Sequence, residues 1–323
     1  MAGRGEGWAG MDYRGWQDHE DVRRRLDAGA DPEAWGAGGS RPLHRAAVFG
    51  SPEVVAELAR RVADVDALEN GTTALWEALT YGRAENARAL AEAGADPWRP
   101  GFGGWSAGRL SLAGPTPDLF RPLPEGVPDL TEAERAVARE GRRLRAAVGA
   151  PDHDGFGLAC VAGIDAAEAI RRLEATPADG EVIAELLEEP YALDTEETLR
   201  LVGVTTVPGG CVVSQPWGYA PNQPGIQKPL SVGTVCYGLY ANPKSGNQGS
   251  IYRDGTGEAW DLHPGGGPDE GQSPREVLFS YVHHGNAVTH ALAFAGLRPT
   301  DARGVTGVPD TWVELPERDY WAP

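Results

Sequence analysis

Apolar residues in the first hundred positions recur at helical spacing, in short stretches that come in pairs. One stretch begins at Pro42, carries the small residues Ala46 and Ala47, and ends at Gly50. A second begins at Ser51 and continues with an apolar stripe formed by Val54, Val55, Leu58 and Val62. Proline is favoured in the first turn of a helix, serine as its N-cap and glycine after its end. The pattern predicts two short helices, one directly after the other.

This paired unit repeats along the chain. Gly29–Pro32 reads Gly-Ala-Asp-Pro, the same four residues return at Gly94–Pro97, and a weaker copy lies between them at Val62–Val65. A tryptophan follows each full copy at nearly the same distance, as Trp35 and Trp98. A period near 33 residues is typical of a helical repeat array. We expect an array over residues 11–122, with well-formed repeats at 41–71 and 72–100 and degenerate ones on either side.

The segment Arg41–Gly50 resembles the ankyrin repeat, whose pattern is T-P-L-H-x-A-A-x-x-G, and the Gly-Ala-Asp-Pro loops fit the same family. The resemblance implies stacked helix pairs with projecting loop tips and a concave face used for protein binding. His44 occupies the family's histidine position, where we expect a structural hydrogen bond. Trp76 replaces that histidine in the next repeat and either fills the space between repeats or protrudes as an anchor.

The partner-facing positions of such an array are the loop tips and the outer side of each first helix. Tryptophan, tyrosine and arginine are frequent interface residues because they bury large areas at modest entropic cost. The alternative for the tip residues Trp35 and Trp98 is that they pack onto their own loops. The candidate partner-binding residues are Trp35, Leu68, Glu69, Trp98 and Arg99 at the tips and Arg45, Phe49, Trp76 and Tyr81 on the first helices.

A stack of so few repeats exposes apolar surface at its ends, because each repeat buries its faces only against neighbours. We therefore expect the C-terminal domain, or the helix that joins it, to cap the stack. Residues 123–151 form the connector: a proline-rich stretch and then a basic helix that Thr131 and Glu134 begin as a capping box.

Residues 152–323 mix strand and helix patterns. Strands are predicted at 156–164, 198–206, 210–215, 231–240, 249–253 and 257–262, and helices at 166–173, 179–188 and 274–296. Tight turns between neighbouring strands favour antiparallel pairing, and the long last helix is expected to cover one face of the sheet. The predicted fold class is multidomain, with an all-α ankyrin stack followed by an α+β domain.

This second domain resembles an actinobacterial family of uncharacterised domains. Four segments carry the resemblance: Val207–Gly210, Pro229–Gly233, Tyr237–Tyr240 and Asp254–His263. The family has an Asn-Gly-Trp turn where this chain has Pro216–Tyr219. The resemblance implies no established activity.

The charge is concentrated in the C-terminal half. Of the net charge of −18, residues 151–323 carry −14, from 10 basic and 24 acidic side chains. Such acidity disfavours unaided binding to nucleic acid or anionic lipid and favours a basic protein partner, or serves solubility alone. Cys160, Cys211 and Cys236 show no CxxC spacing, and with no signal peptide or long apolar run they indicate a cytoplasmic protein without a membrane span.

Catalytic signatures are sparse. The chain has no Walker loop, no GxSxG and no HExxH motif. An acid–base cluster of Tyr237, Asp254, Glu258 and His263 is one candidate, against the simpler interpretation that these acidic residues face solvent. His283 and His290 lie too far apart for simple chelation, and we expect neither a metal nor a cofactor.

Three hypotheses follow. The first is a non-catalytic binding protein, in particular an immunity- or antitoxin-like inhibitor of a basic effector. The second is an enzyme whose repeats recruit a protein substrate, and the third is a scaffold in a bacterial defence assembly.

Overall fold

The computed structural model describes residues 6–35, 39–150, 155–189, 195–242 and 244–322. Two compact units make up the chain. The repeat unit comprises Met1–Ala138 together with Gly267–His284, and the sheet unit comprises Arg139–Gly266 together with Gly285–Pro323. Each unit is therefore built from two separate segments of the chain.

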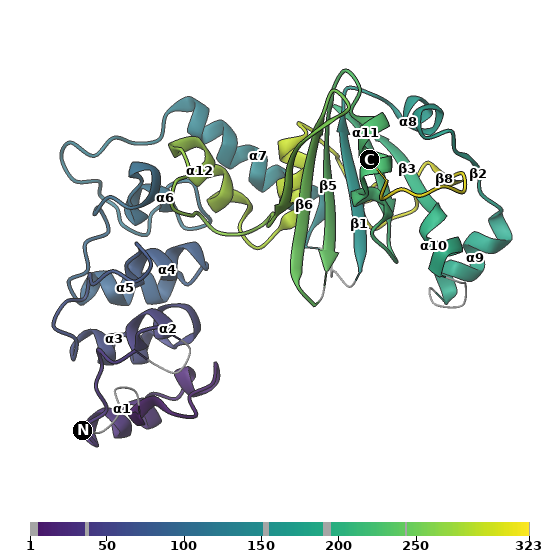
Figure 1. Cartoon of the computed structure of the whole chain (residues 1–323). Coiled ribbons are helices and arrows are strands. Elements are labelled where there is room, and N and C mark those ends of the chain that lie inside the picture. The colour runs from purple at the N-terminus through teal and green to yellow at the C-terminus, as the bar shows by residue number, and fades with distance from the viewer. Residues whose placement is uncertain (1–5, 36–38, 151–154, 190–194, 243, 323) are drawn as a thin grey trace. The chain divides into compact units, whose positions relative to one another are not determined.

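Short helices in successive pairs form the repeat unit (Figure 1). Its α-helices are α1 (His19–Asp27), α2 (Pro42–Phe49), α3 (Pro52–Ala59), α4 (Ala74–Thr80), α5 (Ala84–Glu92), α6 (Ala107–Ser111) and α12 (Pro274–His283). Three 3-10 turns accompany them: η1 (Glu6–Trp8), η2 (Gly15–Gln17) and η3 (Phe102–Gly104).

Side-chain caps and one buried amide define the helix pairs. Ser51 accepts a hydrogen bond from the backbone of Val54 at the start of α3, as the sequence predicts. Fully buried Ala46 and Ala47 let the neighbouring repeat approach α2 closely. The Asn86 amide of α5 donates to the carbonyls of both alanines and to that of Gly50. Consecutive repeats are thus joined by polar contacts as well as by apolar packing.

Helix α12 packs against the last repeat. Its residues Val277, Leu278 and Tyr281 belong to the same buried cluster as the repeat helices. Trp105, which is 2% exposed, donates its indole N–H to the carbonyl of Pro274 over 2.8 Å. The backbone of η3 also comes close, since a Cβ on Gly103 would lie 2.9 Å from Val277. This packing supplies the cap that a short stack requires.

The helix predicted over 274–296 is therefore two helices, α12 and α13 (Ala287–Phe294). The chain breaks between them because Gly285 adopts a φ of 71° and Asn286 caps α13 through a bond from the Thr289 backbone. Only α13 covers the sheet as expected.

The predicted basic helix is α7 (Glu132–Val148), and its capping box is present. Thr131 donates its backbone N–H to Glu134, and its hydroxyl accepts from the backbone of Glu134. The boundary between the two units falls inside this helix, after Ala138.

Across the described residues, eight strands form one sheet in the order β2-β8-β3-β4-β1-β5-β6-β7, with every pair antiparallel. The strands are β1 (Phe156–Ala162), β2 (Thr176–Pro177), β3 (Leu201–Val207), β4 (Gly210–Gln215), β5 (Val235–Asn242), β6 (Gly246–Arg253), β7 (Thr256–Leu262) and β8 (Thr311–Glu314). The helices are α8 (Ala166–Leu173), α9 (Gly180–Glu188), α10 (Thr195–Arg200), α11 (Pro224–Leu230) and α13, with one 3-10 turn, η4 (Ala220–Asn222). The predicted antiparallel α+β domain is confirmed.

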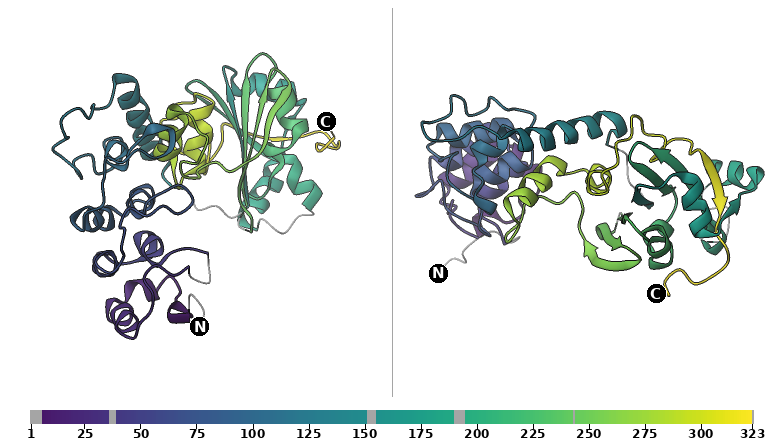
Figure 2. Two further views of the ribbon diagram at one scale, coloured as in Figure 1. Left: turned by 60° about the vertical axis from the view of Figure 1, so that its left-hand side comes forward. Right: turned by 90° about the horizontal axis from the view of Figure 1, so that it is seen from above.

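Helices cover both faces of the central strands (Figure 2). On β1, Leu158 and Cys160 face α13 and the end of α7, whereas Ala159 and Val161 face α8 and α11. A strand buried on both faces needs apolar residues at every position, which explains the uninterrupted apolar run of β1. At the other extreme, most side chains of β7, the last strand of the sheet, are exposed.

Two strand predictions need correction, and two strands have no counterpart among the predictions. The strand predicted at 198–206 begins at Leu201, because the residues before it form α10. The strand predicted at 231–240 begins at Val235, because residues 231–234 form the turn that follows α11 (Pro224–Leu230). The two strands without a predicted counterpart are the short strands β2 and β8.

Candidate functional site

The loop tips of the repeat unit share one turn. The carboxylates of Asp31, Asp64 and Asp96 each accept a hydrogen bond from the backbone N–H two residues later, over 2.8–2.9 Å. These aspartates therefore define the register of the three loops. In this register Trp35 corresponds to Leu68, and Trp98 occupies a different position, that of Glu33. The near-repeat of the two tryptophans in the sequence is not a structural equivalence.

Large apolar side chains at equivalent tips are exposed to solvent. Trp35 is 49% exposed and Leu68 is 48% exposed, one on each of two successive loops. The guanidinium of Arg41 lies 5.5 Å from the Trp35 ring centroid, within cation–π range. The exposed residues Asp31, Asp64 and Asp96 accompany these two side chains. We call the set of Trp35, Leu68 and the three aspartates the tip row.

Two of the candidate tip residues, Glu69 and Trp98, help to hold the loops together, as does Glu33. Glu33 accepts the backbone N–H of Ala63 in the next repeat, and Glu69 accepts that of Arg41, each over 2.7 Å. Trp98 lies against the backbone of the following helix, since a Cβ on Gly108 would lie 2.7 Å from its ring. Trp98 and buried Glu69 are thus explained by packing between repeats.

Arg99 is exposed at the third tip and donates to the carbonyl of Asp66. On α2, the Arg45 guanidinium lies 4.7 Å from the Phe49 ring centroid, and both side chains are half-buried. Tyr81, the C-cap residue of α4, is 53% exposed and makes an edge-to-face contact with His284 at 5.0 Å. These four residues are accessible to a partner.

Trp76 is a packing residue and not a surface anchor. It is 4% exposed, contacts Phe102 at 5.7 Å, and lies so close to Gly101 that a Cβ there would be 2.8 Å away. His44, at the corresponding position of the preceding repeat, bonds the carbonyl of Thr72 through Nε2 and has a pKa lowered by burial. Its expected structural role is confirmed.

The proposed acid–base cluster is not assembled. Tyr237 is 1% exposed on the helix-covered face of β5, and burial raises the pKa of its phenol. Asp254 lies in a turn and accepts the backbone N–H of Gly233. Glu258, on the exposed strand β7, forms an ion pair with Arg253 of β6.

His263 is exposed and bonds the carbonyl of Asn247. These four side chains fail to meet because Tyr237 faces the core, whereas Asp254 lies in a turn, Glu258 on the outer strand and His263 directly after that strand. Closeness in the sequence is therefore not enough to assemble an acid–base cluster from these residues.

The three cysteines are buried and unpaired by disulfides. Burial raises the pKa of Cys211 to about 12 and also raises the pKa values of Cys160 and Cys236. Thiols with such pKa values are poor nucleophiles and poor metal ligands at neutral pH. Within the described ranges, no group of three histidine, cysteine, aspartate or glutamate side chains could hold a metal ion.

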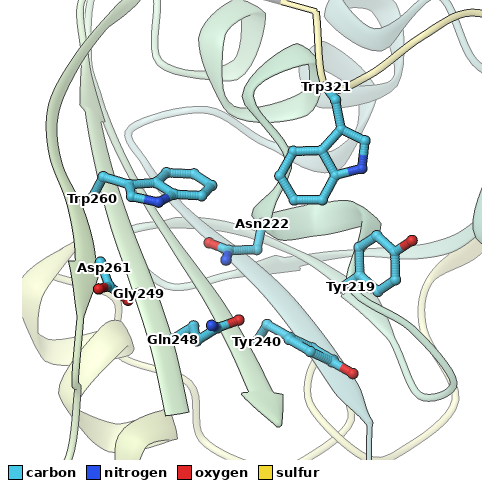
Figure 3. Close-up of a pocket in the computed structure, with 8 residues that line it drawn as sticks. All are labelled: Tyr219, Asn222, Tyr240, Gln248, Gly249, Trp260, Asp261 and Trp321. Atoms are coloured by element: carbon cyan, nitrogen blue, oxygen red, sulfur yellow. The ribbon is translucent and has the colours of Figure 1, made fainter. Parts of the chain in front are cut away.

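A pocket with aromatic walls opens in the sheet unit (Figure 3). Its volume is about 210 Å³. Four rings, two amides, a carboxylate and one glycine line it: Tyr219, Tyr240, Trp260, Trp321, Asn222, Gln248, Asp261 and Gly249. They come from the turn before η4, from η4 itself, from β5, β6 and β7, and from the segment after β8. We call this site the aromatic pocket.

Buried hydrogen bonds fix its floor. The Oδ1 atom of Asn222 accepts the hydroxyl of Ser250 over 2.6 Å and also lies 3.3 Å from the Gln227 amide nitrogen. That amide donates to the hydroxyl of Ser250 as well, over 2.6 Å. Ser250 and Gln227 are fully buried. The network sets the position of Asn222 without any contribution from a ligand.

The position of Trp321 is fixed by the preceding residue, Tyr320. Tyr320 is 6% exposed, accepts the backbone N–H of Gly225 over 2.8 Å and donates its hydroxyl to Pro316. Trp260 and Trp321 are nevertheless 54% and 51% exposed, which leaves their faces accessible at the mouth.

Sequence reasoning missed this pocket because its residues follow no spacing. The available signal was compositional: ten tryptophans, of which Trp260 lies in a polar strand and Trp321 among polar residues near the end of the sequence. Tryptophan is enriched at binding sites, so tryptophans in polar contexts are a weak compositional signal, and only their clustering in the fold defines a site.

Residues 15–100 match ankyrin repeats, in three copies. Residues 144–290 match a family of unknown function, DUF6461. The chain therefore joins an ankyrin-repeat region to a separate domain of that uncharacterised family. A comparison with curated proteins finds no match.

The ankyrin match indicates protein–protein interaction, and the second match carries no functional assignment. Its range includes α12, which packs with the repeats. Within the described part of the chain, no helix combines the length and the apolar character needed to cross a membrane.

Proposed function

We propose that the repeat unit holds a protein partner on the tip row. The observation that carries this proposal is the exposure of Trp35 and Leu68 at equivalent positions of successive loops. A folded protein gains nothing in its own stability from aligning large apolar side chains in water. Aligned in this way, they offer a partner two adjacent hydrophobic anchors of the kind that dominate interface energies. Arg45, Phe49, Tyr81 and Arg99 extend the surface.

The partner we propose is basic. The tip row places three carboxylates beside its apolar residues, and the whole chain carries a net charge of −18. Complementary charge accelerates encounter and selects against acidic proteins. Helix α9 adds an exposed acidic face with Glu181, Glu185 and Glu188.

Within this class we propose an immunity- or antitoxin-like inhibitor that occupies one basic effector stoichiometrically. We place the protein in the cytoplasm, where its three unpaired thiols stay reduced. The supporting features are an interaction array and an acidic domain on one chain.

The test compares three forms of the full chain as baits in affinity purification from the native host: wild type, Trp35→Ala/Leu68→Ala, and a control pair. The control, Val232→Ala/Val308→Ala, removes two apolar side chains of the sheet unit that are 52% and 78% exposed. We expect one basic protein with wild type and the control, and its loss with the tip-row pair. All three baits should unfold within about 0.5 kcal/mol of one another, because the altered side chains are exposed.

Assays with the purified partner then test whether this protein is an inhibitor. An inhibitor should abolish the partner's activity at a one-to-one ratio, with association that slows as salt rises. A partner that binds but remains fully active would refute inhibition and leave protein binding intact. A partner retained equally by the tip-row pair would refute the proposed surface.

A further inference from the structure

The rings of the aromatic pocket enclose a space on several sides (Figure 3). Trp260 and Trp321 are inclined at 71° with centroids 6.3 Å apart, and Tyr219 and Tyr240 at 68° with centroids 5.6 Å apart. Tyr219 also neighbours Trp321 at 5.9 Å, so the rings form a connected wall. Rings at steep mutual angles surround a compact group, whereas a flat platform would serve for stacking a planar one.

The charge around this space is negative. Asp261 contributes a carboxylate, and none of the described residues that line the pocket is basic. The faces of aromatic rings carry negative electrostatic potential and attract cations. Residues 151–323 carry a net charge of −14, which adds a field of the same sign.

The pocket is also small. Its volume of about 210 Å³ is below the range of about 300–1,000 Å³ for pockets that hold drug-sized ligands. Enclosing rings, a single carboxylate and a small volume together suit one bulky cationic group with an apolar surface.

We propose that the aromatic pocket binds a quaternary or highly methylated ammonium group. Its methyl groups pack against the ring faces of Trp260, Trp321, Tyr219 and Tyr240, and its charge is balanced by Asp261. The group reaches the pocket either on a free small amine or on the methylated lysine side chain of a protein. The site belongs to the sheet unit and is independent of the partner proposed for the tip row.

The test titrates the full chain by calorimetry with choline and with 3,3-dimethylbutan-1-ol, its uncharged carbon isostere. We expect choline to bind with a dissociation constant on the order of 1 mM or tighter. The isostere should bind at least about five-fold more weakly, because it has the shape without the charge. Methyl glucoside serves as an uncharged sugar probe and should not bind.

Variants locate the binding. Trp260→Ala should weaken choline binding about five-fold or more, and Trp260→Phe should weaken it less, because phenylalanine keeps a ring face. Asp261→Asn removes only the charge. Asp261 has a φ of 57°, a conformation that asparagine also adopts readily, so this variant should fold unchanged and bind about five-fold more weakly. Tyr13→Ala removes a ring of similar exposure (59%) from the repeat unit and serves as the matched control, which should bind choline like wild type.

The proposal is overturned if the isostere binds as tightly as choline, if only the sugar binds, or if Asp261→Asn and Trp260→Ala both leave choline affinity unchanged. The absence of binding at millimolar choline and millimolar acetyl-trimethyllysine methylamide would overturn it as well. Tighter binding of the trimethyllysine compound than of choline would identify a protein side chain as the source. The reverse order would identify a free amine.

Discussion

The tip row and the aromatic pocket are two exposed surfaces built in opposite ways. In the tip row, one loop recurs, so Trp35 and Leu68 are neighbours because they hold the same place in successive repeats. In the aromatic pocket, Tyr219, Trp260 and Trp321 meet although no period relates them. A repeated surface depends on local turns and on the next repeat. A convergent surface depends on the whole sheet and on the buried polar network beneath it.

The largest expected effect tests whether the stability of the repeat unit depends on α12, the helix that comes from a later part of the chain. Trp105→Ala should lower the free energy of unfolding of the repeat unit by about 3–5 kcal/mol, because it removes a buried ring and its bond to Pro274. Urea unfolding with hydrogen exchange read by mass spectrometry would locate the loss.

Trp105→Phe is the matched control. It keeps most of the apolar bulk but loses the indole N–H, so we expect a smaller cost of about 1–2 kcal/mol. If exchange increased in the strands of the sheet unit and not in α2–α6, the assignment of Trp105 and α12 to the repeat unit would be wrong.

The effect of intermediate size is a loss of stability of the sheet unit at acidic pH. Burial lowers the pKa of His290 to about 4, from 6.5. As pH falls, the unfolded chain binds this proton first, so stability is full above pH 6.5 and declines toward pH 4. The decline should reach about 3 kcal/mol at most. His290→Gln should flatten this part of the stability profile measured by urea unfolding. An unchanged slope in the variant would assign the acid sensitivity to other groups.

The smallest expected effect tests whether the buried hydrogen bonds beneath the aromatic pocket contribute to binding in addition to its rings. Gln227→Ala removes the amide that bonds Asn222 and Ser250, and leaves buried polar atoms without partners. We expect a loss of about 1–3 kcal/mol in urea unfolding.

If this hydrogen-bond network holds the pocket residues in place, Gln227→Ala should also lower the affinity for choline. Binding of a protein partner to the tip row, Arg45 and Phe49 should not change. Full choline affinity in this variant would show that the walls alone define the site.

The same contrast explains what the sequence could reveal. The period near 33 and the caps at Ser51 and Thr131 predicted the repeat helices and the start of α7, because these signals are local. Local signals also predicted the hairpin turn at Asp254 and Gly255, both of which adopt positive φ.

Most of what failed depended on tertiary context. Gly285 and Asn286 do form a local signal for the end of one helix and the start of the next, which the prediction of a single helix over 274–296 overlooked. No local signal indicates that α12 packs with the repeats and not on the sheet. Trp76 and Trp35 look alike as aromatic residues near loops, yet one fills the space between repeats and the other is half exposed. The residues of the aromatic pocket became neighbours only through the strand order, which periodicity does not encode.

The packing of α12 on the last repeat also has a consequence for synthesis. Trp105 and its acceptor Pro274 lie 169 positions apart in the chain. At about 5–20 residues per second, the ribosome needs on the order of 10–30 s to deliver the acceptor after the donor. During that interval the nascent repeats expose an uncovered apolar end. We expect this to be the moment when the chain is most open to chaperones and to premature association with other nascent copies.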